Sequence, residues 1–264
     1  MIINPSLNSL TSSQDALNTS MQRLASGSRI NSAKDDAAGL AVAVSLASQL
    51  GSDSQVMANV STGLSLAETA GGALNQVTDT LLRMRQLAVQ AANAGNTSSD
   101  LQAIQQEFSQ LGQNLDQIAG NTTFNGQALL NGTFSSQFQV GPNAGNSLTF
   151  SLGSVSVQDL GLSGADVSGN ASAVIASIDA ALASVGGMQA NLGAVQGGLN
   201  STMASLSGTY ESLAAARSSI ADTNYDQEST SLAQNSVKNE AALKATALYN
   251  ANQANLLGLL KSSS

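Results

Sequence analysis

The sequence contains no histidine and no cysteine. Without histidine it lacks the commonest general base and metal ligand, and without cysteine it has no disulfide, thiolate nucleophile or thiolate metal site. Aromatic residues make up only 3% and tryptophan is absent, although 42% of the residues are hydrophobic. An enzyme is therefore the least favoured class, and no cofactor or metal is expected.

Positive charge is missing from the middle of the chain. No Lys or Arg lies between Gln86 and Ala216, a stretch with seven acidic residues, although the whole chain carries a net charge of −8. Those residues are Asp100, Glu107, Asp116, Asp159, Asp166, Asp179 and Glu211. Such a stretch has no cations to neutralise phosphates, so neither nucleic acid nor an anionic membrane surface is an expected partner.

No uninterrupted apolar run reaches the roughly 18 residues of a membrane-spanning helix, so no bilayer-spanning segment is expected. The first ten residues, MIINPSLNSL, lack a basic stretch followed by a continuous apolar one. A cleaved secretory signal peptide is therefore not expected either, and secretion would need another export route.

Near the N-terminus one apolar side chain recurs every seven residues: Ile3, Leu10, Leu17 and Leu24. This spacing predicts one apolar stripe along a helix, with Gly27 as its end. Ser32-x-x-Asp35 has the form of a capping box, so a second helix is expected to start near Ser32. A single narrow stripe cannot be buried by the helix alone and needs a partner helix.

Longer helical patterns follow. Apolar residues spaced by three and four from Val60 to Ala91 predict a helix of about 33 residues, roughly 50 Å long. The same spacing from Leu101 to Ile118 predicts a helix that folds back on it. A seven-residue repeat from Val185 to Ile220 predicts a third helix of about 45 to 50 residues. Glycine pairs within these patterns are interpreted as sites of close helix packing: Gly71-Gly72, Gly186-Gly187 and Gly197-Gly198.

Residues 121–169 change to a period of two. Asn125-Gly126 and Asn131-Gly132 are typical of turns, and Leu148, Phe150 and Leu152 alternate with polar residues as in a hairpin strand. The predicted fold is mainly α, a long antiparallel helical bundle or coiled coil with a small β-hairpin region. Its N- and C-terminal helices are expected to pair.

Six blocks carry a family resemblance: RLASGSRINSAKDDAAGLAVA (23–43), LLRMRQLAVQAAN (81–93), TTFNGQALLNG (122–132), FQVGPNAGNSLTFSLG (138–153), SLAAARSSIADTNYDQE (212–228) and ANQANLLGLLK (251–261). They resemble the bacterial flagellin family, in the order in which that family has them. The chain looks like a short form, with an N-terminal helix about one heptad shorter than usual and only residues 157–169 in place of a variable outer domain.

The resemblance implies a secreted structural subunit that self-assembles into the flagellar filament used for motility. Residues 1–36 plus 222–264 would form a coiled-coil inner tube, and 37–221 a helical outer layer with the hairpin region at 121–169. Export would use the flagellar type III secretion apparatus, without a cleaved signal peptide. The implied partners are further copies of the chain, an export chaperone at the C-terminus, the filament cap and hook-filament junction proteins.

Three sets of site residues follow from the resemblance. The assembly seam comprises Ile3, Leu10, Leu17, Leu24, Leu256, Leu257, Leu259 and Leu260. The inter-subunit joint comprises Arg23, Arg29, Lys34, Asp35 and Asp36, whose alternative interpretation is a solvated, capped helix start. A candidate patch for a host Toll-like receptor comprises Arg83, Arg85, Leu87 and Glu107, together with Val89. The same patch could instead be helix surface buried between subunits, and Gln86 replaces a glutamate common in recognised members.

Two other functions stay open. A hook-filament junction protein would share the terminal patterns but usually lacks the full RINSAKDDAAGLA and FNGQALL blocks. A flagellin-like protein that binds a cell-surface polysaccharide would need an aromatic-lined or basic groove. The middle of the chain has neither tryptophan nor a cation, which argues against a groove for an acidic glycan.

Overall fold

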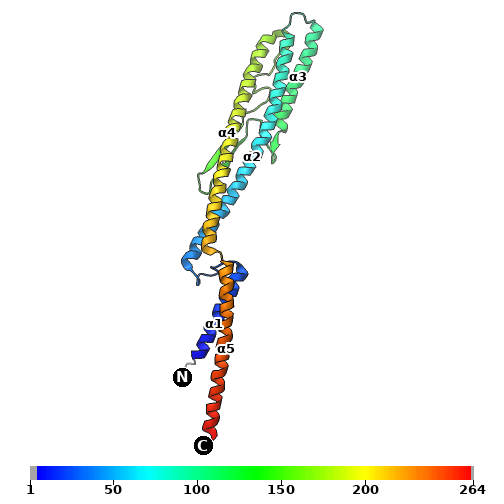
Figure 1. Ribbon diagram of the computed structural model, residues 1–264. Helices are drawn as coiled ribbons and strands as arrows, with labels where there is room; N and C mark the ends of the chain where they lie inside the picture. Colours follow the sequence, from blue (N-terminus) through cyan, green and yellow to red (C-terminus); the bar gives the residue numbers. More distant parts are fainter. Residues whose placement is uncertain (1–4, 263–264) are drawn as a thin grey trace. The chain divides into compact units, whose positions relative to one another are not determined.

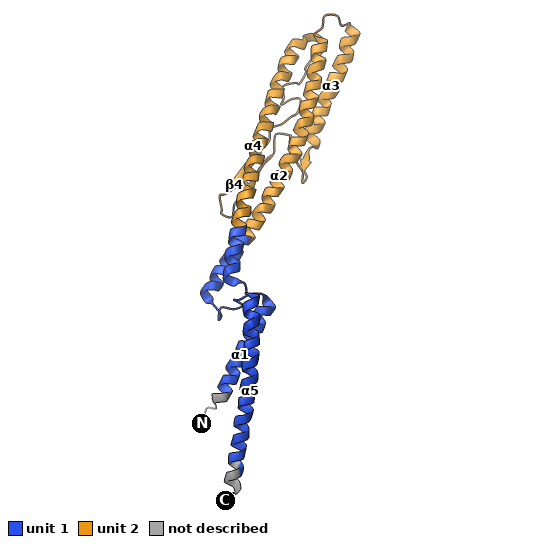
Figure 2. Cartoon of the chain, viewed as in Figure 1, with its two compact units in different colours: residues 1–50, 211–264 blue, residues 51–210 orange. Residues whose placement is uncertain are grey.

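The computed structural model describes residues 5–262. Over this range the chain is mainly helical, as predicted (Figure 1). Its elements are α1 (Pro5–Ser26), α2 (Ala37–Ala91), α3 (Ser98–Asn121), β1 (Thr123–Phe124), β2 (Gln127–Ala128), β3 (Ser135–Gln139), β4 (Ser147–Ser151), α4 (Val167–Ala221) and α5 (Tyr225–Ser262). They group into two compact units: unit 1 holds residues 1–50 and 211–264, and unit 2 holds residues 51–210 (Figure 2).

Unit 2 is a bundle in which α3 and α4 lie alongside α2 (Figure 1). Its core contains Leu74 and Leu81 of α2, Leu115 of α3 and Ile178 of α4, all without solvent exposure. The predicted seven-residue repeat of α4 supplies more of the buried surface through Val185, Leu192, Leu199 and Leu206. The apolar periods in the sequence therefore correspond to the faces that the helices bury.

Two hairpins complete unit 2, where the sequence predicted them. Asn125 and Gly126 both have positive φ, 49° and 78°, and form the two-residue turn between β1 and β2. The second hairpin pairs β3 with β4 in antiparallel register, from Ser135 opposite Ser151 to Gln139 opposite Ser147. Phe150 of β4 packs edge-on against Phe134, with 5.8 Å between ring centroids.

The connection from β4 to α4 is fastened to α3 at two points. The Asp116 carboxylate accepts a hydrogen bond from the Val157 backbone N–H at 2.9 Å. Further along, the Gln105 side chain accepts from the Val167 N–H at 2.8 Å and donates to the Ala165 carbonyl at 3.2 Å. Between these anchors the backbone turns at Gly161 and Gly164, both with positive φ.

The predicted helix start near Ser32 is wrong. α2 begins at Ala37, because the Asp36 carboxylate caps it by accepting the Gly39 N–H at 2.8 Å. Ser32 and Asp35 instead close a turn ahead of the helix. The helix expected near Ser32 and the one expected from Val60 are a single 55-residue helix.

The interpretation of the glycine pairs is largely wrong. A Cβ added at Gly71 would contact Leu192 at 3.3 Å, which fits close packing of α2 on α4. The other five positions have nothing within 4 Å of such a Cβ: Gly72, Gly186, Gly187, Gly197 and Gly198. They lie on exposed helix surface, so close helix packing does not account for them.

By length and composition α4 could also cross a membrane, since 18 of its residues average a mean hydropathy of 1.5. The expectation that the chain has no such stretch counted only uninterrupted apolar runs and missed this average. Core helices of water-soluble proteins pass the same test, so one such helix is weak evidence for a span. Only 22% of that 18-residue stretch is buried, although the α4 residues that recur every seven positions pack in the core of unit 2.

Unit 1 contains α1 packed antiparallel against α5, so the terminal helices pair as expected (Figure 1). Leu10, Leu17 and Leu24 are half-buried. The most deeply buried residues of α5 over the described range are polar, Asn239 and Thr246, each 8% exposed. The helix pair therefore joins a leucine stripe to a largely polar one.

Candidate functional site

The segment between α1 and α2, where the joint residues lie, is held against the end of α4. Gly27 has a φ of 68°, which ends α1, and its carbonyl accepts the Thr223 N–H at 3.0 Å. The Arg29 N–H donates to the Ala221 carbonyl at 2.7 Å. These bonds fix the path of the segment within unit 1.

The two arginines of the predicted joint are both used inside the chain. The Arg29 guanidinium donates to the Ile220 carbonyl at 2.6 Å, at the C-terminus of α4 where the helix dipole favours a cation. Arg23 on α1 forms an ion pair with Glu228 on α5 at 3.7 Å. Its Nε is buried and has no hydrogen-bond partner among the described residues.

The two aspartates of the joint shape the start of α2. One Asp35 carboxylate oxygen accepts the N–H groups of Asn31 and Ser32 and the Ser32 hydroxyl. These hydrogen bonds, first the one from Asn31, hold the pKa of Asp35 below its ordinary value. Asp36 is the helix cap, and a Cβ at Gly39 would lie only 2.3 Å from its carboxylate. A larger residue at position 39 would therefore force the Asp36 carboxylate and the Ile30 side chain to shift.

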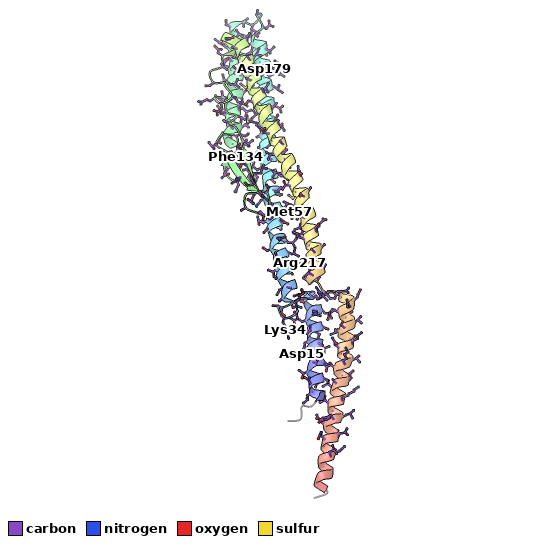
Figure 3. The ribbon with its side chains drawn as sticks, turned by 90° about the vertical axis from the view of Figure 1, so that its left-hand side faces the viewer. Asp15, Lys34, Met57, Phe134, Asp179 and Arg217 are labelled. Atoms are coloured by element: carbon purple, nitrogen blue, oxygen red, sulfur yellow. The ribbon has the colours of Figure 1, made fainter. Side chains whose placement is uncertain are left out.

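A cavity of about 310 Å³ is lined by Arg23, Arg29, Ile30, Asp35 and Asp36. The structure thus brings four of the five predicted joint charges together. Lys34 is exposed (Figure 3) and has no ion pair or hydrogen bond within the described part of the chain. Of the five, Lys34 is the charge that intramolecular contacts leave available, and a contact with another copy stays a prediction.

The two arginines of the candidate receptor patch, Arg83 and Arg85 on α2, form ion pairs with α3 and α4. Arg83 contacts Glu107 on α3 at 2.5 Å, and Arg85 contacts Asp179 on α4 at 2.6 Å. All four side chains are about half exposed. The helix predicted to fold back on α2 made such a proximity possible, and the ion pair shows that Glu107 lies beside Arg83.

Leu87 does not lie on that surface. It is only 2% exposed and belongs to the core of unit 2, whereas Leu82 and Val89 on the same helix are 45% and 50% exposed. The spacing of four between Arg83 and Leu87 correctly predicted that they lie about one turn apart. It did not show that Leu87 faces the core of the bundle, so Leu87 is removed from the candidate contact surface.

The seam residues are only partly described. Leu10, Leu17 and Leu24 are half-buried and Leu256 is 56% exposed. Ile3 and the side chains of Leu257, Leu259 and Leu260 lie outside the described residues. Val237, Leu243 and Leu248 on α5 are also exposed apolar side chains, and the sequence did not single them out because no apolar period marks them.

Among residues 5–262 no group of three or more Asp or Glu side chains lies close enough together to hold a metal ion. The charged side chains form ion pairs, caps and turns instead. What the arrangement offers is contact surface: exposed apolar residues on the terminal helices and a charged segment beside them.

Stability should fall in acid. Hydrogen bonds to their carboxylates hold the pKa values of Asp35, Asp100, Asp159, Asp166 and Asp179 below 3.8. A folded-state pKa below the unfolded one contributes stability above about pH 4, which is lost as the pH falls through the folded values. The urea midpoint should therefore stay level from about pH 7 to 5 and drop below about pH 4.

Asp100→Asn offers a check on this acid dependence, because Asp100 and Thr97 form the capping box of α3. The variant should lose part of the drop while keeping the rest. A urea midpoint that rises between about pH 5 and pH 3 would contradict the prediction.

Comparison with known proteins gives consistent findings at both ends of the chain. Residues 1–135 match the model of the bacterial flagellin N-terminal helical region, and residues 175–260 match that of the C-terminal helical region. The phase 1 flagellin of Salmonella naestved is 41% identical over 171 residues, as is the flagellin of Salmonella enteritidis. These alignments cover 65% of this chain and 34% of each relative, so the chain spans about a third of their length.

Solved structures are similar as well. The flagellin of Bacillus cereus matches with a TM-score of 0.52 and 27% identity, over 56% of this chain and 88% of that one. A putative flagellar hook-associated protein from Vibrio parahaemolyticus matches with a TM-score of 0.63 over 71% of this chain and 100% of that one. Its identity is 15%, so it supports the fold alone.

Proposed function

Because the chain belongs to the bacterial flagellin family, we propose that it is a structural subunit that self-assembles into the flagellar filament used for motility. The observation that carries this proposal is the match of both terminal helical regions on one chain. Flagellins are structural rather than catalytic proteins, and the proposal extends this to the present chain. The proposed function requires no cofactor, metal ion, nucleic acid or membrane.

The apolar residues on the surface of unit 1 support self-association. Leu7 on α1 and Val237, Leu243 and Leu248 on α5 are between 50% and 67% exposed in the single chain. Burial of such side chains against neighbouring copies would remove apolar surface from water. We assign residues 1–36 plus 222–264 to the inner tube and residues 37–221 to the outer layer of the filament.

The remaining partners follow from this role. The protein would be extracellular, exported by the flagellar type III apparatus and bound before export by a chaperone at its C-terminus. It would meet the filament cap and the hook-filament junction proteins at the two ends of the polymer. In the short monomer, the connection around residues 157–169 would face outward in place of a variable domain.

Seeded polymerisation tests the proposal. Purified protein added to short filament fragments should elongate them, as seen by electron microscopy, because a filament end presents the complementary surface of the last subunits. A hook-filament junction protein, the second candidate function, would not extend the seeds. A polysaccharide-binding protein would bind glycan without extending them.

A receptor assay on monomer tests the candidate patch, now without Leu87. Arg83→Ala and Glu107→Ala should each weaken signalling through a host Toll-like receptor, by on the order of 1 to 4 kcal/mol if these charges lie at the centre of the contact. Glu68→Ala, an exposed residue elsewhere on α2, is the matched control. If wild-type monomer is silent where another flagellin signals, the chain evades the receptor and Gln86 is the first suspect.

A further inference from the structure

The side of α5 that packs on α1 is mostly polar. Its covered residues recur three and four apart, as in a coiled coil: Glu228, Ser231, Leu232, Asn235, Asn239, Ala242, Thr246 and Tyr249. The leucines at 243 and 248 point elsewhere and are 50% and 67% exposed. The partner face of α1 contributes the half-buried Leu10, Leu17 and Leu24 together with the buried Ser20. Contacts between leucines therefore contribute little to the stability of the α1–α5 pair.

Two contacts set the level of α1 against α5. Arg23 pairs with Glu228 at 3.7 Å, and the Asn235 amide donates to the Ser20 hydroxyl at 3.2 Å. Continuing these two antiparallel contacts along both helices places the turn of residues 12–16 of α1, which contains Ser13, at the level of Asn239.

Asn239 is 8% exposed, and its Oδ1 is buried without a hydrogen-bond partner among the described residues. The Ser13 hydroxyl is likewise buried without a hydrogen-bond partner among the described residues. A hydroxyl donates and an amide oxygen accepts, so the two orphaned groups at this level are chemically complementary.

A buried amide distinguishes one register from another. In the observed register Asn239 lies at the level of the turn that contains Ser13, but a shift of about one turn would bring it toward Leu10 or Leu17, where its amide finds no partner. A leucine at this position would pack against the leucines of α1 in any register. Single buried asparagines set register and partner number in coiled coils in the same way, at a cost in stability.

We propose that Asn239, with Ser13 opposite it, fixes the register in which α1 and α5 pair and restrains association of the chain outside the filament. This assignment rests on the proposed filament function. It makes Asn239 a specificity-determining residue of the assembly surface, whereas the exposed leucines supply the apolar area.

The test compares Asn239→Leu with Asn250→Leu, the same chemical change at an exposed position of α5. Without seeds, Asn239→Leu should raise the oligomer fraction measured by light scattering about tenfold over wild type, since the buried amide no longer penalises wrong pairings. With seeds, its elongation rate should fall, because mispaired ends dock poorly. Asn250→Leu should do neither, and Asn239→Gln, which keeps an amide, should stay close to wild type.

The inference is overturned if Asn239→Leu matches Asn250→Leu in unseeded association. Should wild-type protein fail to elongate seeds, the filament function fails, while the unseeded comparison still decides the role of Asn239. If Asn239→Leu does not refold, Asn239→Ala replaces it in the same comparison. A Ser13→Ala substitution should then change association in wild type but not in the Asn239→Ala background, since the two residues act as a pair.

Discussion

Replacing Leu17 by Asp is expected to abolish polymerisation while leaving unit 2 folded. Leu17 is half-buried against α5 in the single chain, at the centre of the leucine stripe of α1. A carboxylate placed in such a seam has no cation to pair with and costs several kcal/mol. Seeded elongation followed by electron microscopy measures the effect, and circular dichroism checks that the bundle is intact. Leu24→Asp should behave in the same way.

Gln14→Asp provides the matched control for this loss. It adds the same charge to α1, at a position that is exposed in the structure. Elongation by this variant should stay near the wild-type rate, because an exposed carboxylate remains hydrated. Normal filaments from Leu17→Asp would show that the stripe is not a buried seam of the polymer.

Replacing Leu81 by Ala should produce the largest loss of stability in unit 2. Leu81 has no solvent exposure and packs in the core that α2, α3 and α4 share. Removing three buried carbon atoms and leaving a cavity costs about 2 to 5 kcal/mol. This is a large share of the roughly 5 to 15 kcal/mol that stabilises a typical protein. Urea unfolding followed by circular dichroism gives the difference directly.

Leu82→Ala is the control, one residue further along the same helix and 45% exposed. Its cost should stay below about 1 kcal/mol, since less apolar surface is returned to water. Equal losses for the two variants would mean that the α2 face assigned to the core is not the one that packs.

The helices of unit 2 could be predicted because their apolar period records which face is buried. Leu74, Leu81 and Leu115 recur at helical spacing and all three are in the core. Helix boundaries were harder to predict, because several side chains near a helix start are able to cap it. Only the structure shows which of them reaches the free N–H groups. Ser32 and Asp35 had the right spacing for a capping box, yet Asp36 caps the helix. The backbone path through Gly27 and Arg29, fixed by α4, decides between them.

The candidate site was less predictable because its properties depend on pairs of elements. The sequence placed Leu87 about one turn from Arg83, but only the packed bundle shows that Leu87 is buried. A search for apolar heptads also cannot find the polar face of α5, since Asn235 and Asn239 differ from exposed polar residues only by the presence of α1. Burial of a polar side chain is a property of the helix pair and leaves no period of its own.

The anchoring of the β4–α4 connection has an evolutionary consequence. Gln105 and Asp116 of α3 hold the two ends of this loop by hydrogen bonds. Ser163 and Gly164 at its tip are exposed and contribute no buried side chain to the bundle. Lengthening a loop costs little, about 0.6 kcal/mol for each doubling. Descendants of this chain could therefore accept whole domains between Ser163 and Gly164, and change the exterior of their polymer, while the packing of α2, α3 and α4 stays under separate selection.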